Sequence, residues 1–184
     1  MRISECDVLI VPGLSGSDEG HWQSRWEDRL STATRVAQVD WNAPDREAWV
    51  DTLVQAVAAT TRPAVIVAHS LGALTAAHAA PEFASGKVIG GFLVAVPDAE
   101  QAEGMPAEVA RFGPVPTEPL PFPSLFVASR NDPFCSFSRA QEIALDWGAQ
   151  IVDAGEVGHL NAASGHGPWP EGLMRLGQFL GRLG

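Results

Sequence analysis

Positive charge is scarce in this sequence. Its 184 residues carry a formal net charge of −10, and Lys87 is the one lysine among them. No cluster of lysine and arginine residues stands out. An acidic surface of this kind repels the phosphates of nucleic acids and the headgroups of anionic lipids. We therefore expect neither a nucleic-acid partner nor a membrane partner.

Long apolar runs and clustered cysteines are also missing. The longest apolar runs cover about eight residues, whereas a membrane-spanning helix needs roughly 20. Residues 1–12 have an early arginine followed by Glu5 and Asp7, which does not match a secretory signal, so the expected location is cytoplasmic. Cys6 and Cys135 lie too far apart in sequence to suggest a metal site, and we expect free, buried thiols in a reducing compartment.

Apolar runs typical of strands alternate with amphipathic runs typical of helices. This order predicts an α/β fold, a three-layer α/β/α sandwich with a mostly parallel six-stranded sheet. No linker or repeat is visible, so we expect a single domain over residues 1–184, which can bury roughly 70% of its unfolded surface. The predicted strands are 8–11, 36–39, 64–68, 88–96, 124–128 and 150–152, and the predicted helices are 21–30, 45–61, 71–84, 138–147 and 172–183.

Two of these helices carry more detailed signals. Ser138 and Gln141 have the spacing of a capping box, which predicts the start of the 138–147 helix, and Gly148 is its expected end. In the last helix, Leu173 and Leu176 lie on the stripe that we expect to face the core.

The segment from 104 to 123 interrupts the alternation with prolines at 106, 114, 116, 119, 121 and 123. From Pro114 onward it cannot be helical and should run extended over the surface. It could form one wall of a cleft, or it could be only a rigid connector.

The stretch 65–72 is the most informative in the chain. Three branched apolar residues, suited to a buried strand, lead to Ala68-His69-Ser70-Leu71-Gly72, and a helix-forming run follows. A strand, a sharp turn with serine and then a helix form the nucleophile elbow of α/β-hydrolases. The usual pattern is G-x-S-x-G, and Ala68 departs from it by one methyl group, which we expect to fit tightly. The alternative is that Ser70 only caps an ordinary helix.

Two more candidates follow predicted strands. Asp132 lies in a turn held by Pro133, just after the 124–128 strand, and His159 follows Gly158 shortly after the last strand. Binding sites in parallel α/β sheets lie at the carboxyl ends of the strands. Asp132 alone could be a turn former before proline, and His159 alone could be an ordinary loop residue. The chain order Ser, Asp, His matches that of α/β-hydrolases and favours a catalytic triad.

Other acids and histidines are weaker candidates. Asp98 also follows a strand and competes with Asp132 for the role of the acid. His69 adjoins Ser70 in sequence, so we expect the elbow to point its side chain away from the nucleophile. His78 lies within a predicted helix, and His166 lies in a glycine-rich loop with no strand before it.

The proposed chemistry explains why these residue types are needed. A serine hydroxyl is a poor nucleophile until a histidine nitrogen about 3 Å away takes its proton. This proton transfer raises the reaction rate by roughly 10²–10⁴-fold. The aspartate orients the histidine. The developing oxyanion needs donors, for which we nominate the backbone N–H groups of Leu14 and Leu71. No metal and no organic cofactor is required.

Four aromatic or histidine positions bear on this predicted site. His21 should open the first helix beside it and, with Phe134, is a candidate for lining the substrate cleft. Trp22 and Trp26 are expected to belong to the core instead.

The sequence resembles the small serine hydrolases grouped with YdeN and retinoblastoma-binding protein 9, compact members of the α/β-hydrolase superfamily. The resemblance covers nearly the whole chain. It rests on Val11-Pro12-Gly13, His21-Trp22 with Trp26, Ala68-His69-Ser70-Leu71-Gly72, Leu120-Pro121-Phe122-Pro123-Ser124, Ala128-Ser129 with Asn131-Asp132-Pro133, and Gly158-His159-Leu160-Asn161.

The resemblance implies a six-stranded core without a large helical lid, and a triad of Ser70, Asp132 and His159. It does not carry over a retinoblastoma-type partner, because the chain has no L-x-C-x-E peptide. The prediction is a serine hydrolase acting on small carboxylic esters or related acyl compounds, and thioesters and amides share the same machinery. The alternative is a non-catalytic protein-interaction module on the same fold.

Overall fold

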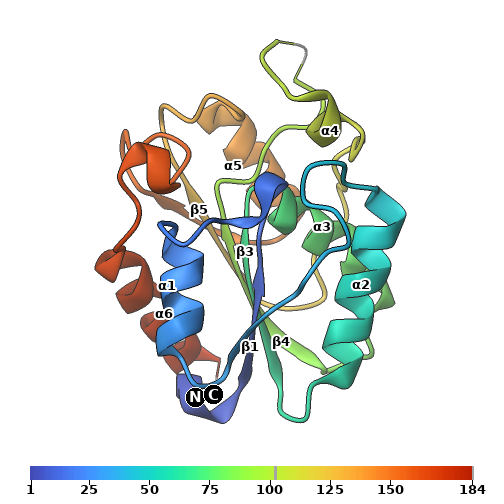
Figure 1. Cartoon of the computed structure of the whole chain (residues 1–184), viewed down its shortest axis with the longest axis vertical. Coiled ribbons are helices and arrows are strands. Elements are labelled where there is room, and N and C mark those ends of the chain that lie inside the picture. The colour runs from blue at the N-terminus through green and yellow to red at the C-terminus, as the bar shows by residue number, and fades with distance from the viewer. Residues whose placement is uncertain (102, 184) are drawn as a thin grey trace.

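A computed structural model describes residues 1–101 and 103–183 of the chain. The strands are β1 (Asp7–Val11), β2 (Ala33–Arg35), β3 (Ala64–His69), β4 (Val88–Val94), β5 (Ser124–Ala128) and β6 (Gln150–Asp153). They form one sheet in the order β2-β1-β3-β4-β5-β6, and each neighbouring pair is parallel (Figure 1). Every residue of β3 is buried, as expected for the middle of a parallel sheet covered on both faces.

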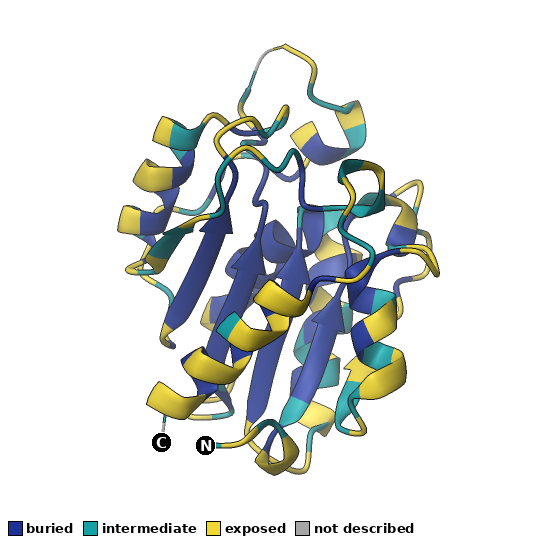
Figure 2. Cartoon of the chain, turned by 90° about the vertical axis from the view of Figure 1, so that its left-hand side faces the viewer, coloured by how far each residue is buried: buried dark blue, intermediate teal, exposed yellow. Residues whose placement is uncertain are grey.

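Helices cover both faces of the sheet and complete the predicted three layers. The helices are α1 (Trp22–Arg29), α2 (Arg46–Ala59), α3 (Leu71–Ala79), α4 (Ala107–Ala110), α5 (Phe137–Asp146) and α6 (Pro170–Arg182), with short 3₁₀ turns η1 (Ile3–Glu5), η2 (Leu14–Gly16), η3 (Ala80–Glu82) and η4 (Ala162–Ser164). One core contains Trp26 of α1 and Leu180 of α6. The other contains Leu53, Leu74 and Ile143 from α2, α3 and α5. Figure 2 shows the buried strands between helices whose outward residues are exposed.

The structure corrects three local predictions. The second strand is Ala33–Arg35 and not 36–39: the N–H of Val36 still donates to Ile10 O, but the chain then turns away and leaves Val39 94% exposed. Ser136, not Ser138, caps α5, because its side chain accepts from the N–H of Arg139. Leu173 is 38% exposed, whereas Leu176 on the same helix is fully buried. The buried stripe of α6 is therefore narrower than expected and does not include Leu173.

The carboxyl ends of the strands gather at one edge of the sheet, and the loops after β1, β3 and β5 meet there (Figure 1). The proline-containing segment between β4 and β5 also crosses this edge. It forms the short helix α4 and then runs without helix or strand from Pro114 to β5. None of the described helices is both long enough and apolar enough to cross a membrane.

Candidate active site

Ser70 stands at the sharp turn between β3 and α3. Its backbone has φ 53° and ψ −127°, a strained combination for a residue with a side chain. The turn requires glycine two residues later, because a Cβ on Gly72 would lie 2.3 Å from the carbonyl oxygen of Val11. Ala68 is accommodated at the other small position and is fully buried within β3. Close packing of the turn at 68–72 against the end of β1 therefore sets the position of the serine.

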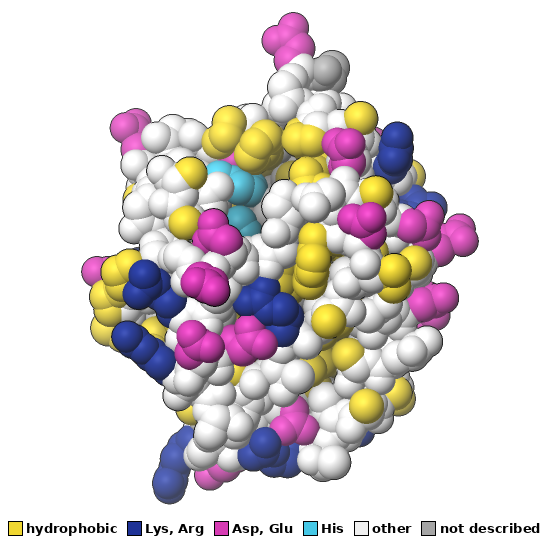
Figure 3. All heavy atoms as spheres, viewed as in Figure 1, with side chains coloured by type: hydrophobic (Ala, Val, Ile, Leu, Met, Phe, Trp, Pro, Cys, Tyr) yellow, Lys and Arg dark blue, Asp and Glu magenta, His cyan; other side chains and the backbone are white. Residues whose placement is uncertain are grey.

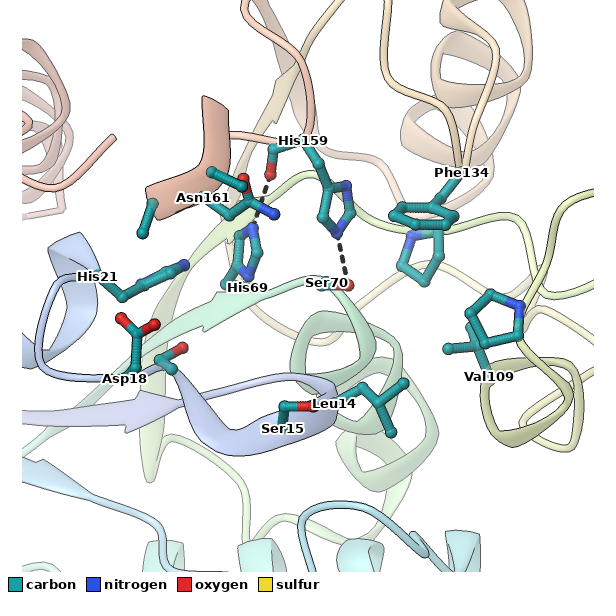
Figure 4. Close-up of a pocket in the computed structure, with 15 residues that line it drawn as sticks. Leu14, Ser15, Asp18, His21, His69, Ser70, Val109, Phe134, His159 and Asn161 are labelled. Atoms are coloured by element: carbon teal, nitrogen blue, oxygen red, sulfur yellow. Dashed lines mark hydrogen bonds between the residues drawn. The ribbon is translucent and has the colours of Figure 1, made fainter. Parts of the chain in front are cut away.

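The structure brings Ser70, Asp132 and His159 together at this edge. His159 Nε2 lies 2.8 Å from Ser70 Oγ, and His159 Nδ1 lies 2.9 Å from both carboxylate oxygens of Asp132. The side chains of His159 and Asp132 are 9% and 3% exposed. Since Nδ1 faces a carboxylate, the imidazole proton belongs on Nδ1, and Nε2 is left to accept the serine hydroxyl proton. This is a triad-like arrangement (Figure 4).

Side-chain hydrogen bonds hold the Asp132 loop against the His159 loop. The Asn131 Oδ1 atom accepts from Ser129 Oγ at 2.8 Å and from the N–H of Gly158 at 2.7 Å. Ser129 Oγ in turn accepts from the N–H of Val157 at 3.1 Å. These bonds fix the separation of the two loops, and therefore the carboxylate–imidazole distance.

Asp98, the competing acid, is engaged elsewhere. Its carboxylate lies 3.5 Å from Arg139 Nε, and its backbone N–H donates to Phe134 O. Asp98 thus supports the loop that carries Phe134, while the carboxylate beside His159 comes from Asp132.

The loop after β1 packs directly on the elbow. A Cβ on Gly13 would lie 2.9 Å from Ser70 Cβ and 3.1 Å from the backbone nitrogen of Leu71. In the part of the chain that the structure describes, the N–H groups of Leu14 and Leu71 donate to no protein acceptor, whereas the N–H of Ser15 donates to Trp41 O. Two free donors beside a serine hydroxyl suit an oxyanion.

Arg35 braces this loop from the sheet edge. Its guanidinium donates to the carbonyl oxygens of Gly16 and Ser17 and to Ser24 Oγ, and its Nε lies 2.8 Å from a carboxylate oxygen of Glu27. Sequence reasoning missed this residue, because nothing local in the sequence relates Arg35 to the loop after β1.

His69 does not lie where the sequence suggested. It lines the same cavity as Ser70, and its Nε2 donates to the backbone carbonyl of His159 at 2.9 Å. Burial holds the pKa of His69 well below its ordinary value, so the ring is neutral. The missed signal was the alternation of β3, which places His69 on the same face as Val65 and Val67, toward α1.

His21 lies at the N-terminal cap of α1 and is 5% exposed. Its Nδ1 accepts from the N–H of Gln23 at 3.1 Å, and burial lowers its pKa to about 4. Trp22 and Trp26 belong to the core, as predicted, and the indole N–H of Trp22 donates to Leu160 O beside His159. His21, the predicted cleft residue, therefore forms part of the cavity wall although its side chain is almost fully buried.

The cavity above Ser70 has a volume of about 380 Å³. His21, His69 and His159 all line it, and Figure 3 shows histidine side chains in a hollow with hydrophobic side chains along its upper rim. Phe134 also lines it, with its ring 4.7 Å from that of His159 in an edge-to-face contact. Pro106 of the segment between β4 and β5 contributes to a wall, so this segment shapes the cleft. His78 and His166 lie outside this cavity.

Known proteins resemble the chain in sequence and fold. A family model described as serine hydrolase matches residues 8–178. A solved structure of a candidate YdeN-like hydrolase from Pectobacterium atrosepticum is 38% identical, with 98% of this chain and 94% of that chain covered and a TM-score of 0.87. No curated protein matches the chain.

Two more distant structures share the fold. The product of the ydeN gene of Bacillus subtilis is 21% identical, with 96% of this chain and 99% of that chain covered and a TM-score of 0.76. The esterase domain of a Rhodothermus marinus protein is 15% identical, with 96% of this chain and 87% of that chain covered and a TM-score of 0.68. At these identities the likeness concerns the fold alone.

Proposed function

The chain belongs to the serine hydrolase family, within the α/β-hydrolase superfamily, and on that basis we propose that it hydrolyses small carboxylic esters or related acyl compounds through an acyl-enzyme on Ser70. The observation that carries this proposal is the position of His159, whose two ring nitrogens contact Ser70 Oγ at 2.8 Å and Asp132 at 2.9 Å. The substrate is a small molecule. The cytoplasmic location expected from the sequence stays a prediction.

The first half-reaction forms the acyl-enzyme. His159 Nε2 takes the hydroxyl proton of Ser70 as Oγ bonds to the acyl carbon, and the carbonyl electrons move to oxygen. The tetrahedral intermediate then collapses: the bond to the leaving group breaks, and the leaving group takes the proton from His159. Base catalysis of this kind raises the reaction rate by roughly 10²–10⁴-fold.

The second half-reaction returns the free enzyme. A water molecule gives a proton to His159 Nε2 and bonds to the acyl carbon. Collapse of this second intermediate breaks the bond to Ser70 Oγ, which recovers the proton from His159, and the carboxylic acid leaves. Asp132 holds the Nδ1–H tautomer throughout and stabilises the imidazolium that forms twice in the cycle.

The oxyanion of each intermediate is stabilised by the backbone N–H groups of Leu14 and Leu71. The Leu71 N–H lies in the first turn of α3, where the helix dipole also favours negative charge. Removing one such donor typically lowers kcat by about 10²–10³-fold. The lowered pKa values of His21 and His69 keep both rings neutral at pH 7, so they add no charge that would disfavour the imidazolium.

A fluorophosphonate probe tests the proposal, because it reacts with serines that an adjacent base activates. We expect stoichiometric labelling of Ser70 in the wild type, together with hydrolysis of short-chain esters, and neither in Ser70→Ala with an unchanged thermal midpoint. A folded wild-type protein that stays unlabelled would contradict the proposal and favour the protein-interaction module.

A further inference from the structure

The cavity that contains Ser70 has two unlike ends. Ser70 lies between them, with Asp18 and His21 on one side and Val109 and Phe134 on the other (Figure 4). Asp18 and His21 at the first end, the polar end, carry hydrogen-bonding side chains, whereas Val109 and Phe134 at the second end are apolar. A substrate that spans the serine therefore meets hydrogen-bonding groups on one side of its carbonyl and hydrocarbon on the other.

His21 supplies an unused donor at the polar end. Its Nδ1 accepts from the backbone N–H of Gln23, so the single proton of the neutral ring is on Nε2. Nε2 is buried and has no acceptor among the described residues. A buried donor without a partner is costly, and such groups recur at functional sites where a ligand supplies the partner. In Figure 4 the ring points from α1 toward the interior of the cavity.

Asp18 supplies an acceptor next to this donor. Its backbone carbonyl accepts from the N–H of His21, and its carboxylate is the largest nearby charge acting on the imidazole. No described side chain or backbone group donates to that carboxylate. The polar end thus combines a neutral N–H donor with a negative acceptor.

This combination selects among ligand groups. A carboxylate would accept from His21 but would be repelled by Asp18, and an ammonium group would suit Asp18 but would place a donor against the N–H of His21. A hydroxyl group both accepts and donates, so it satisfies the two residues at once.

We propose that the polar end binds a hydroxyl group of the substrate, accepting from His21 Nε2 and donating to Asp18. The substrate class is then an ester or related acyl compound with hydrocarbon on one side of the scissile bond and a hydroxylated group on the other. This inference rests on the proposed function and makes His21 a specificity-determining residue.

Two matched pairs of esters test the inference. 2-Hydroxyethyl butanoate and propyl butanoate differ only by a hydroxyl for a methyl group in the alcohol, and ethyl 3-hydroxybutanoate and ethyl 3-methylbutanoate differ in the same way in the acyl group. One neutral hydrogen bond corresponds to about three- to tenfold in affinity. We expect kcat/KM of the wild type to favour the hydroxylated member of at least one pair by about this factor.

The His21→Asn variant keeps a side-chain oxygen that can cap α1, but its shorter side chain leaves no N–H donor at the position of Nε2. It should lower that preference to about one, and fluorophosphonate labelling of Ser70 checks that the site is still folded. His78→Asn is the matched control, because His78 lines a different cavity, and its preference should equal that of the wild type. The same esters are also titrated into Ser70→Ala by NMR, which measures dissociation constants without turnover.

The outcomes separate the two proposals. Hydrolysis without preference in either pair, or a preference that survives in His21→Asn, would overturn the role of the polar end while leaving the hydrolase intact. Tighter binding of a hydroxylated ester to Ser70→Ala, with no hydrolysis or labelling in the wild type, would support the polar end and contradict the hydrolase.

Discussion

The two sides of the contact between Ser70 and His159 are built differently. The elbow side, residues 11–16 and 68–72, is held by backbone segments so close that Gly13 and Gly72 have no room for a Cβ. The loop side, residues 129–134 and 155–161, is held by side-chain hydrogen bonds through Ser129 and Asn131. Ser70 is thus positioned by backbone packing, whereas Asp132 and His159 are positioned by side-chain hydrogen bonds that single substitutions can remove.

Gly72→Ala should have the largest effect, because it attacks the elbow side directly. The new Cβ would lie 2.3 Å from Val11 O and 2.4 Å from Pro12 O, so β1 or α3 must move. We expect a loss of at least about 3 kcal/mol in the free energy of unfolding, measured by urea denaturation, together with loss of fluorophosphonate labelling.

Gly177→Ala is the control for this change. Gly177 is also helical, in α6, but a Cβ there meets nothing within 4 Å. It should be neutral or raise stability by up to about 1 kcal/mol. Equal losses in the two variants would mean that close backbone packing is not what fixes the elbow.

Asp132→Asn should have the next largest effect, now on the loop side. The amide keeps the shape of the carboxylate but no longer selects the Nδ1–H tautomer, so kcat should fall by about 10³–10⁴-fold with a smaller change in KM. The thermal midpoint shows whether the loop remains folded.

Asp98→Asn provides the comparison for that substitution. It breaks the ion pair with Arg139, whose N–O distance is 3.5 Å, and leaves the carboxylate next to His159 in place. Its kcat should therefore stay within about tenfold of the wild type. If the two variants lost activity equally, the assignment of Asp132 as the orienting acid would be wrong.

The same contrast explains what the sequence could predict. The elbow was readable because its constraints are local: a branched strand, a serine and a glycine two residues later. The fold class followed from the alternation of strand and helix patterns, and the structure confirms it. The roles of Arg35 and Asn131 were not readable, because each depends on contacts between segments that the sheet, not the sequence, brings together.

The wrong local predictions have the same origin. Val36 and Val39 look like a strand, yet only Val36 reaches β1 before the chain leaves the sheet edge. His69 was expected to point away from Ser70 because it was considered only as its neighbour in sequence. Its position at the end of a buried strand, facing α1, is what turns it toward His159.

His69 joins the two sides, since it lies on the elbow and donates to the carbonyl of His159. Its pKa is lowered by burial from the ordinary value of 6.5, so below about pH 6.5 the unfolded chain takes up a proton that the folded protein does not. The free energy of unfolding should therefore fall as the pH decreases through this range. His21, whose pKa is lowered to about 4, contributes a fall of the same sign between pH 6.5 and 4.

His69→Gln keeps an N–H donor but removes one of the two histidines that take up a proton only in the unfolded chain. The difference in free energy of unfolding between wild type and variant should shrink as the pH falls below 6.5, by at most about 1.4 kcal/mol per pH unit. Urea denaturation at several pH values between 7.5 and 5 measures it. If the free energies of unfolding of the two proteins changed in parallel with pH, His69 would not be held neutral in the folded protein. Its hydrogen bond would then join the elbow side and the loop side without lowering stability at acidic pH.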